Sequence, residues 1–186
     1  QAQCIVYRGP DSEHSGKEIC FGSNETALSI ADVSDKSAPV ALASASYPNT
    51  GYTHQGWIDE QHEYFYVNDE LDERNNGNVD SMTTYVVRVG NLEKPRLVRT
   101  RRWGLPIIDH NSMVQGDRLY MSAYEGGLRV IDISRPLRPR MQGWFDTYPD
   151  ADEPRFLGAW GVFAGFPSGN VIVTDIQRGL FVITAR

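Results

Sequence analysis

Short runs of β-branched and aromatic residues recur along the chain, and they predict strands rather than helices. Four runs resemble one another: residues 28–34, 85–89, 127–134 and 179–183. A proline follows three of these four runs within a few residues. Since proline cannot continue a central strand, it marks the turn by which the chain leaves the strand. Helical periodicity is almost absent, and the one short candidate, around residues 59–64, is better interpreted as a hairpin turn.

Two further series of segments precede these runs and set a period. One series consists of strands that end at Asp69, Tyr124 and Asp175, which are 55 and 51 residues apart. The other opens each unit and places His54, His110 and Trp160 at equivalent positions, 56 and 50 residues apart. A period near fifty residues with three or four strands per unit is typical of β-propeller blades.

The sequence therefore predicts an all-β fold, a β-propeller of about three full blades plus a partial one. The predicted boundaries are a disulfide loop and lead-in at 1–23, a partial blade at 24–50, blades at 51–107 and 108–157, and a final blade at 158–186. Closed propellers have about four to eight blades, so we expect the chain to be part of a larger ring. Because open edges and apolar faces are rarely left exposed, we expect missing sequence before Gln1 or another chain to complete that ring.

The two cysteines, Cys4 and Cys20, flank a polar segment that contains glycine and proline. A disulfide closing this loop would contribute about 3 kcal/mol to the free energy of unfolding. The alternative is a pair of buried free thiols. We favour the disulfide, which implies an oxidising compartment. The first residues show no leader pattern, so the chain is either cytosolic or has lost its leader, and the cysteines favour the second interpretation.

Several motifs together resemble a known family. The repeated run at 28–32 and its counterpart at 129–132 resemble the LVIVD repeat of bacterial and archaeal surface proteins. More specifically, the chain is similar to the C-terminal half of the choice-of-anchor B family, through residues 7–11, 18–20, 24–26, 52–57, 68–73, 109–111, 127–129 and 178–181. The resemblance implies an exported β-propeller that is tethered to the envelope, in a periplasmic, cell-surface or extracellular location. It implies no activity, because the family's biochemical role is not established. The chain departs from the pattern because the N-terminal half is absent and no anchor follows Ala185 and Arg186.

Charge and composition exclude two classes of partner. The chain has 186 residues, of which 40% are hydrophobic, and a net charge of −6. An acidic balance disfavours a general nucleic-acid binder. No stretch approaches the roughly 20 apolar residues that a membrane-spanning helix needs. The sequence therefore predicts neither a nucleic-acid partner nor a membrane span.

The sharpest local feature is acidic. Residues 59–80 contain eight acidic residues and one basic residue. The predicted ligands within this segment are Asp69, Glu70, Asp72 and Glu73, followed by the neutral oxygens of Asn75, Asn76 and Asn78. Carboxylate and amide oxygens beside a glycine turn suit Ca²⁺, although the spacing does not match an EF-hand loop. We expect this segment to bind Ca²⁺, and the alternative is a solvated acidic loop.

A second set of candidates lies where the innermost strands of a propeller meet its central channel. It consists of His54, Asp109, His110, Asn111 and Trp160. Histidine and aspartate together could bind a transition metal or act as acid and base. The alternative is that the histidines hydrogen-bond across blades and hold the ring together, and Trp160 at the third equivalent position supports packing.

Two classes of function remain, because the chain lacks a GxSxG motif, a reactive cysteine and a phosphate loop. The first is an exported, envelope-associated, calcium-stabilised propeller that binds a protein or glycan ligand on one face. The second is a propeller hydrolase or lactonase with a metal near the central channel. The second needs three or four polar ligands that converge on one point at the ends of the inner strands. Fold alone does not decide between them, and we favour the first.

Overall fold

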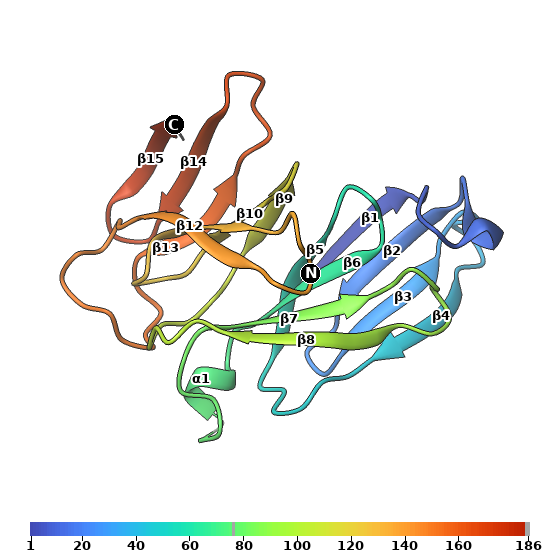
Figure 1. Cartoon of the computed structure of the whole chain (residues 1–186), viewed down its shortest axis with the longest axis horizontal. Helices are drawn as coiled ribbons and strands as arrows, with labels where there is room; N and C mark the ends of the chain where they lie inside the picture. Colours follow the sequence, from blue (N-terminus) through green and yellow to red (C-terminus); the bar gives the residue numbers. More distant parts are fainter. Residues whose placement is uncertain (76, 185–186) are drawn as a thin grey trace.

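Four antiparallel sheets follow one another along the chain in a computed structural model that describes residues 1–75 and 77–184 (Figure 1). The first sheet contains β1 (Ala2–Val6), β2 (Glu18–Ser23), β3 (Leu28–Asp32) and β4 (Val40–Ala45). The second contains β5 (Thr53–Ile58), β6 (Tyr64–Asp69), β7 (Thr83–Arg88) and β8 (Arg96–Arg102). The third contains β9 (Ser112–Gln115), β10 (Arg118–Ser122), β11 (Leu128–Asp132) and β12 (Arg140–Phe145). The fourth contains β13 (Ala159–Phe163), β14 (Asn170–Asp175) and β15 (Gly179–Thr184).

In every sheet the strands are paired in chain order, which is the arrangement of a propeller blade. The all-β, propeller-like fold is therefore confirmed, and residues 59–63 form the hairpin turn between β5 and β6. Helical structure is short in the described residues: a 3₁₀ turn at Ser12–His14 and one turn, α1, at Asp72–Asn75. Neither is long and apolar enough to cross a membrane.

The blade boundaries differ from the expectation at the N-terminus. The first sheet has four strands and includes β1 and β2, whereas the sequence assigned residues 1–23 to a lead-in. These two strands lack the repeated signature, so the period could not reveal them. Cys4 and Cys20 lie directly opposite each other on β1 and β2 and are disulfide-bonded, which confirms that prediction. Asn76, Ala185 and Arg186 lie outside the described residues.

The core lies between neighbouring sheets, because the middle strands are apolar on both faces. In β6, Phe65 and Val67 pack toward the first sheet, whereas Tyr66 packs toward the third. The alternation follows from the two-residue period of a strand. Phe65 stacks on Phe21 of β2 with ring centroids 5.5 Å apart. Burial of each such ring contributes about 1.5–3 kcal/mol, so packing between blades is the main stabilising interaction.

The fourth sheet has a neighbouring sheet on one face only. Phe181 and Ile183 of β15 pack toward the third sheet. Leu180 and Val182, which alternate with them, are 59% and 65% exposed. This apolar face is consistent with a ring that continues, and completion of the ring remains a prediction.

The first strands of consecutive sheets contact one another, so that β5 lies between β1 and β9, and β9 contacts β13. Isolated bridges join Glu25 to Thr53 and Tyr124 to Ala159, which fixes the neighbouring blades at the point where these strands begin. Residues at the starts of the four inner strands are therefore brought together, although they are distant in sequence.

Candidate functional site

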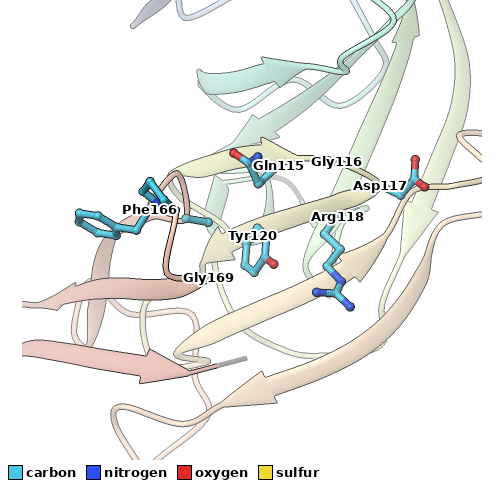
Figure 2. A pocket seen from close by; sticks show the side chains of 9 residues that line it. Gln115, Gly116, Asp117, Arg118, Tyr120, Phe166 and Gly169 are labelled. Carbon is cyan, nitrogen blue, oxygen red and sulfur yellow. The ribbon is translucent and has the colours of Figure 1, made fainter. Parts of the chain in front are cut away.

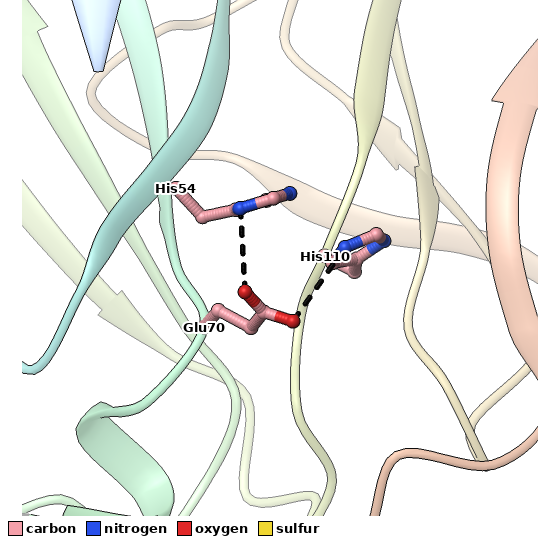
Figure 3. Close-up of side chains that lie close together, drawn as sticks. All are labelled: His54, Glu70 and His110. Carbon is pink, nitrogen blue, oxygen red and sulfur yellow. Dashed lines mark ion pairs between the residues drawn. The ribbon is translucent and has the colours of Figure 1, made fainter. Parts of the chain in front are cut away.

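Three side chains from two blades converge where the inner strands begin: His54 of β5, Glu70 just after β6, and His110 just before β9 (Figure 3). His54 Nδ1 lies 3.3 Å from Glu70 Oε2, and His110 Nε2 lies 3.6 Å from Glu70 Oε1. The two imidazole rings stack with centroids 4.3 Å apart. One donor atom from each residue lies within 4.8 Å of the other two.

A local irregularity in the strand aims His54 at this point. Thr53 pairs with Asp69 and Gln55 pairs with Asn68, so His54 is the extra residue of a β-bulge. Trp160 occupies the same position in β13, between Ala159 and Gly161, where the register also shifts. Bulges re-aim side chains and are common beside functional sites. The equivalent positions in the sequence are therefore equivalent in structure.

The backbone of His110 is held by its neighbours on both sides. Asn68 of β6 donates from Nδ2 to the His110 carbonyl oxygen at 2.8 Å. The His110 backbone N–H donates to the carbonyl oxygen of Ser122 in β10. The ring is buried, with 1% of the residue exposed. His110 is thus fixed before any ligand arrives.

The hydrogen bond from His110 Nδ1 decides its tautomer. Nδ1 lies 2.6 Å from the Trp160 carbonyl oxygen, which can only accept, so Nδ1 carries the hydrogen. Burial lowers the pKa of His110 to about 4, so the ring is neutral near pH 7. Nε2 then carries a lone pair that is directed toward Glu70, and it has no hydrogen-bond partner among the described residues.

His54 can adopt either tautomer. In one, Nε2–H donates to Asn111 Oδ1 at 3.3 Å and leaves the Nδ1 lone pair toward Glu70. In the other, Nδ1–H donates to Glu70 and Nε2 accepts from the Gln1 amide at 3.1 Å. Burial lowers the pKa of His54 as well, so this ring is also neutral near pH 7. A cation between the three side chains would select the first tautomer.

Glu70 is oriented by a tyrosine from the connection between β10 and β11. The Tyr124 hydroxyl donates to Glu70 Oε1 at 2.5 Å. Burial and the neighbouring carboxylate raise the pKa of Tyr124, so its hydroxyl remains a donor. Tyr124 lies in the left-handed region with φ of 39°, and its backbone bridges to Ala159. The Glu70 carboxylate is therefore oriented by a hydrogen bond from a fixed tyrosine, as the ligands of metal sites commonly are.

Two imidazole nitrogens and a carboxylate are a donor set that suits a divalent transition metal such as Zn²⁺. Two ligands bound to tetrahedral zinc at about 2.1 Å lie roughly 3.4 Å apart. The separations of 3.3 Å from His54 Nδ1 to Glu70 Oε2 and 3.6 Å from His110 Nε2 to Glu70 Oε1 are close to that value, and one ligand atom from each of the three residues lies within 4.8 Å of the others. The side chains of His54 and Glu70 are 15% and 17% exposed, so solvent can reach the position between them.

The remaining channel candidates divide into two groups. Asn111 and Trp160 lie at the His54–Glu70–His110 cluster, where Asn111 Nδ2 donates to the Trp160 carbonyl oxygen at 2.9 Å. Asp109 does not lie at this cluster, because its buried carboxylate lies beside Asp72 and Glu73. Sequence reasoning missed Gln1 and Tyr124 as neighbours of the cluster. The repeat spacing had placed Tyr124 at the end of a strand, which was the only signal for it.

The four predicted calcium ligands are divided among three environments. Asp69 accepts hydrogen bonds from five donors, namely the Tyr47 hydroxyl and the backbone N–H groups of Gly51, Tyr52, Leu71 and Asp72. Its carboxylate is thus already satisfied by the protein. Glu70 joins the histidines. Asp72 and Glu73 approach Asp109, with one carboxylate oxygen of each within 4.8 Å of the others.

Burial dominates the acid–base behaviour of this second group. It raises the pKa of Asp72 to about 6 and that of Glu73 to about 12, and it raises the pKa of Asp109 well above its usual range. Repulsion from neighbouring carboxylates adds to each upward shift, from Asp109 and Asp72 on Glu73, from Asp72 and Asp69 on Asp109, and from Asp69 on Asp72. Without a cation, these carboxyl groups therefore retain protons that ordinary surface acids would lose.

An open pocket lies at the other end of β9, away from both clusters (Figure 2). It is formed by the β9–β10 hairpin, residues 115–118, and by the loop after β13 that contains Phe166 and Gly169. The arrangement offers an aromatic ring, a tyrosine and an arginine at a blade edge (Figure 2). It brings together no group of acids or histidines of the kind seen at His54.

Comparison with known proteins identifies the repeat. Residues 15–45 and 111–147 match the LVIVD repeat. The two matches cover β2–β4 and β9–β12, that is, most of the first sheet and the whole of the third. Comparison with curated proteins gave no match.

A solved structure shares the fold of this chain. It is the crystal structure of a functionally unknown protein from Desulfotomaculum acetoxidans DSM 771, with a TM-score of 0.58 and 8% sequence identity. The alignment covers 98% of this chain and 56% of that protein. The chain therefore spans just over half the length of that structure, and the likeness concerns the fold alone.

Proposed function

We propose that this LVIVD-repeat chain is a metal-binding β-propeller module whose central site, His54, Glu70 and His110, takes a divalent transition metal such as Zn²⁺. The observation that carries the proposal is the fixed tautomer of His110. Its Nδ1–H is committed to the Trp160 carbonyl oxygen, so the Nε2 lone pair faces the Glu70 carboxylate at 3.6 Å. Two acceptors that face each other repel, and a bound cation reverses the sign of that interaction.

The wider role proposed for the module is ligand binding outside the cytosol. The disulfide between Cys4 and Cys20 suits an oxidising compartment. The resemblance to the choice-of-anchor B family supports an exported protein that is associated with the envelope. We assign a protein or glycan ligand to one face of the propeller, with the metal holding neighbouring blades together at their inner strands.

A metal-dependent hydrolase or lactonase is a second candidate, and one observation favours it. Three protein ligands leave the fourth position of a tetrahedral metal open, as in catalytic zinc sites. His54 and Glu70 are partly exposed, so water and a small substrate can reach that position. Zinc there would lower the pKa of bound water and supply a hydroxide nucleophile. The Tyr124 hydroxyl lies beside the same carboxylate.

Calorimetric titration of the metal-free protein with Zn²⁺ tests the proposal. We expect one saturable site, lost in His110→Ala and retained in the matched control His62→Ala. His62 lies in the β5–β6 turn and accepts a hydrogen bond from the Arg8 backbone, outside the cluster. Zinc binding that survives in His110→Ala, or is absent from the parent chain, would overturn the proposal.

Turnover separates the two candidates. Lactone and ester substrates are assayed with the zinc-loaded protein and with the zinc-loaded Glu70→Gln variant. Hydrolysis that requires zinc and Glu70 would establish the hydrolase, whereas zinc binding without turnover supports the binding module.

A further inference from the structure

We propose that Asp72, Glu73 and Asp109 form a second cation site, an oxygen-only pocket that takes Ca²⁺ and joins the second blade to the third. It shares no ligand with the His54–Glu70–His110 cluster, so it stands or falls separately from the proposed function. Its ligand set also differs from the one that the acidic run alone suggests, since Asp109 replaces Asp69 and Glu70.

The three carboxylates come from two separate segments. Asp72 and Glu73 lie in α1, between β6 and β7 of the second sheet, and Asp109 precedes β9 of the third sheet. One oxygen from each lies within 4.8 Å of the others. Asp72 and Asp109 are both completely buried. A run of acids in one loop would not produce this arrangement, because the third ligand arrives from another blade.

Five buried oxygens in this pocket have no hydrogen-bond partner among the described residues other than the neighbouring carboxyl groups of the pocket itself. They are both oxygens of Asp109, both of Glu73, and Oδ1 of Asp72. Asp109 is the decisive member, because its carboxylate is wholly buried and lies beside the α1 acids, and neither oxygen has a partner outside this group of carboxyls. Burying an unpaired carboxylate is strongly unfavourable, so such groups occur where a counter-charge or a proton compensates them.

No basic side chain supplies that counter-charge. Across residues 1–75 and 77–184, the ion pairs to lysine and arginine involve other acids: Glu18, Asp32, Glu63, Glu125, Asp150 and Glu153. Arg74, the nearest arginine in sequence, lies over the Phe156 ring at 4.5 Å. The pocket thus contains three acids and no cationic residue of the protein.

The donor chemistry selects a hard cation. All three side chains offer carboxylate oxygens, which can act as monodentate or bidentate ligands, and Ca²⁺ takes about six to eight oxygens. Nitrogen and sulfur, which transition metals prefer, are absent from the set. The Tyr85 hydroxyl donates to Asp72 Oδ2 at 2.7 Å and leaves Oδ1 free for the ion. This contact orients the ligand in the manner of an outer-shell partner.

Asp69 holds the start of α1 in place. The backbone N–H groups of Leu71 and Asp72 donate to Asp69 Oδ1 at 3.2 and 3.1 Å. Asp69 thereby fixes the start of the turn against β6, so its own carboxylate acts as an anchor and not as a ligand. An ion in the pocket would join this anchored turn to the segment that carries His110.

Thermal unfolding of the metal-free full chain, with and without 5 mM CaCl₂, tests the site. Ligand that binds only the folded state raises the unfolding temperature in proportion to the logarithm of its concentration. We expect a rise of roughly 5 °C or more for a chain of this size. The variants are Asp109→Asn and, as a matched control, Asp80→Asn, an exposed acid near α1. Calcium should raise the unfolding temperature of the control as much as that of the parent chain, and it should not change the unfolding temperature of Asp109→Asn.

Terbium luminescence is the second readout. It is measured on the parent chain, so it does not depend on whether a substituted chain folds. Tb³⁺ alone occupies calcium sites, and a tyrosine within a few ångströms sensitises its emission, so Tyr85 should excite it. We expect emission that saturates at one Tb³⁺ per chain and is displaced by Ca²⁺. Absence of both a calcium-dependent shift and displaceable emission overturns the proposal, as does a full calcium shift in folded Asp109→Asn.

Discussion

Two clusters of titratable side chains share two chain segments, residues 70–73 and 109–110, and His54 of β5 completes one of the clusters. Glu70 and His110 contribute to the partly exposed cluster with His54, whereas Asp72, Glu73 and Asp109 make the buried one. Asp109 and His110 are neighbours in sequence and point to different clusters. Successive residues of an extended chain project to opposite sides, so a single segment can serve two sites.

The difference between the clusters is chemical. The exposed cluster combines two neutral imidazoles with one carboxylate, which suits a borderline metal such as Zn²⁺. The buried cluster contains carboxylates alone, which suits a hard cation such as Ca²⁺. The four acids within residues 69–73 are therefore divided by the fold among an anchor, a cluster of mixed nitrogen and oxygen donors, and a cluster of oxygen donors alone.

Removing the shared anchor should have the largest effect, because it disturbs both clusters at once. Asp69→Ala leaves buried N–H and O–H donors without an acceptor, and each such donor costs about 1–3 kcal/mol. We expect a loss of about 3–5 kcal/mol in the free energy of unfolding, measured by urea denaturation. The matched variant is Asp175→Ala, whose side chain accepts from two backbone N–H groups among the described residues, those of Gln177 and Arg178. An equal loss in the two variants would contradict this account of Asp69.

Glu70→Gln sharpens the comparison because it removes one charge from the acidic run without changing the size of the side chain. Glu70 belongs with the histidines, so zinc affinity should fall by about 100-fold while the calcium-dependent shift in unfolding temperature persists. Calorimetry measures the first and thermal unfolding the second. Loss of the calcium response together with zinc affinity would place Glu70 in the buried cluster instead.

A smaller effect is expected from Tyr124→Phe, which removes the hydroxyl that holds Glu70. Outer-shell partners of metal ligands contribute about 10–100-fold to affinity, and we expect the lower end, about 10-fold, for Zn²⁺. Calcium binding should not change. Competition against a chromogenic zinc chelator measures the difference, and an unchanged zinc affinity would show that Tyr124 does not orient the carboxylate.

Tyr85→Phe is the corresponding change beside the buried cluster and should have the smallest effect. It removes the donor to Asp72 Oδ2 and leaves all three carboxylates in place. We expect calcium affinity to fall by less than about 10-fold, with zinc affinity unchanged. Calcium titration followed by unfolding temperature measures it, and a change in zinc affinity instead would contradict the separation of the two clusters.

The sequence predicted the parts of this arrangement that follow from its period. Blades repeat around an axis, so equal spacing placed His54, His110 and Trp160 at equivalent positions, and their rings do meet. The cysteine pair was predicted by its isolation and by the polar loop between its members, and the two are disulfide-bonded.

The division of the acidic run could not be predicted, because it depends on irregular backbone. His54 is aimed by a bulge, and α1 turns Asp72 away from Glu70 within two residues. Neither feature has a signature in residue type. The pairing of Asp109 with α1 also depends on how two blades pack, which no local pattern encodes. Contacts between blades therefore decide the site, whereas patterns within blades decide the fold.

Metal content of two neighbouring variants tests the central claim, that adjacent residues serve two chemically distinct sites. The metal-free chain, His110→Ala and Asp109→Asn are each equilibrated with Zn²⁺ and Ca²⁺ together, freed of unbound ions, and analysed by mass spectrometry of the elements. We predict one zinc and one calcium in the parent chain, calcium alone in His110→Ala, and zinc alone in Asp109→Asn. Loss of both metals from either folded variant, or a parent chain that holds neither, would contradict the account.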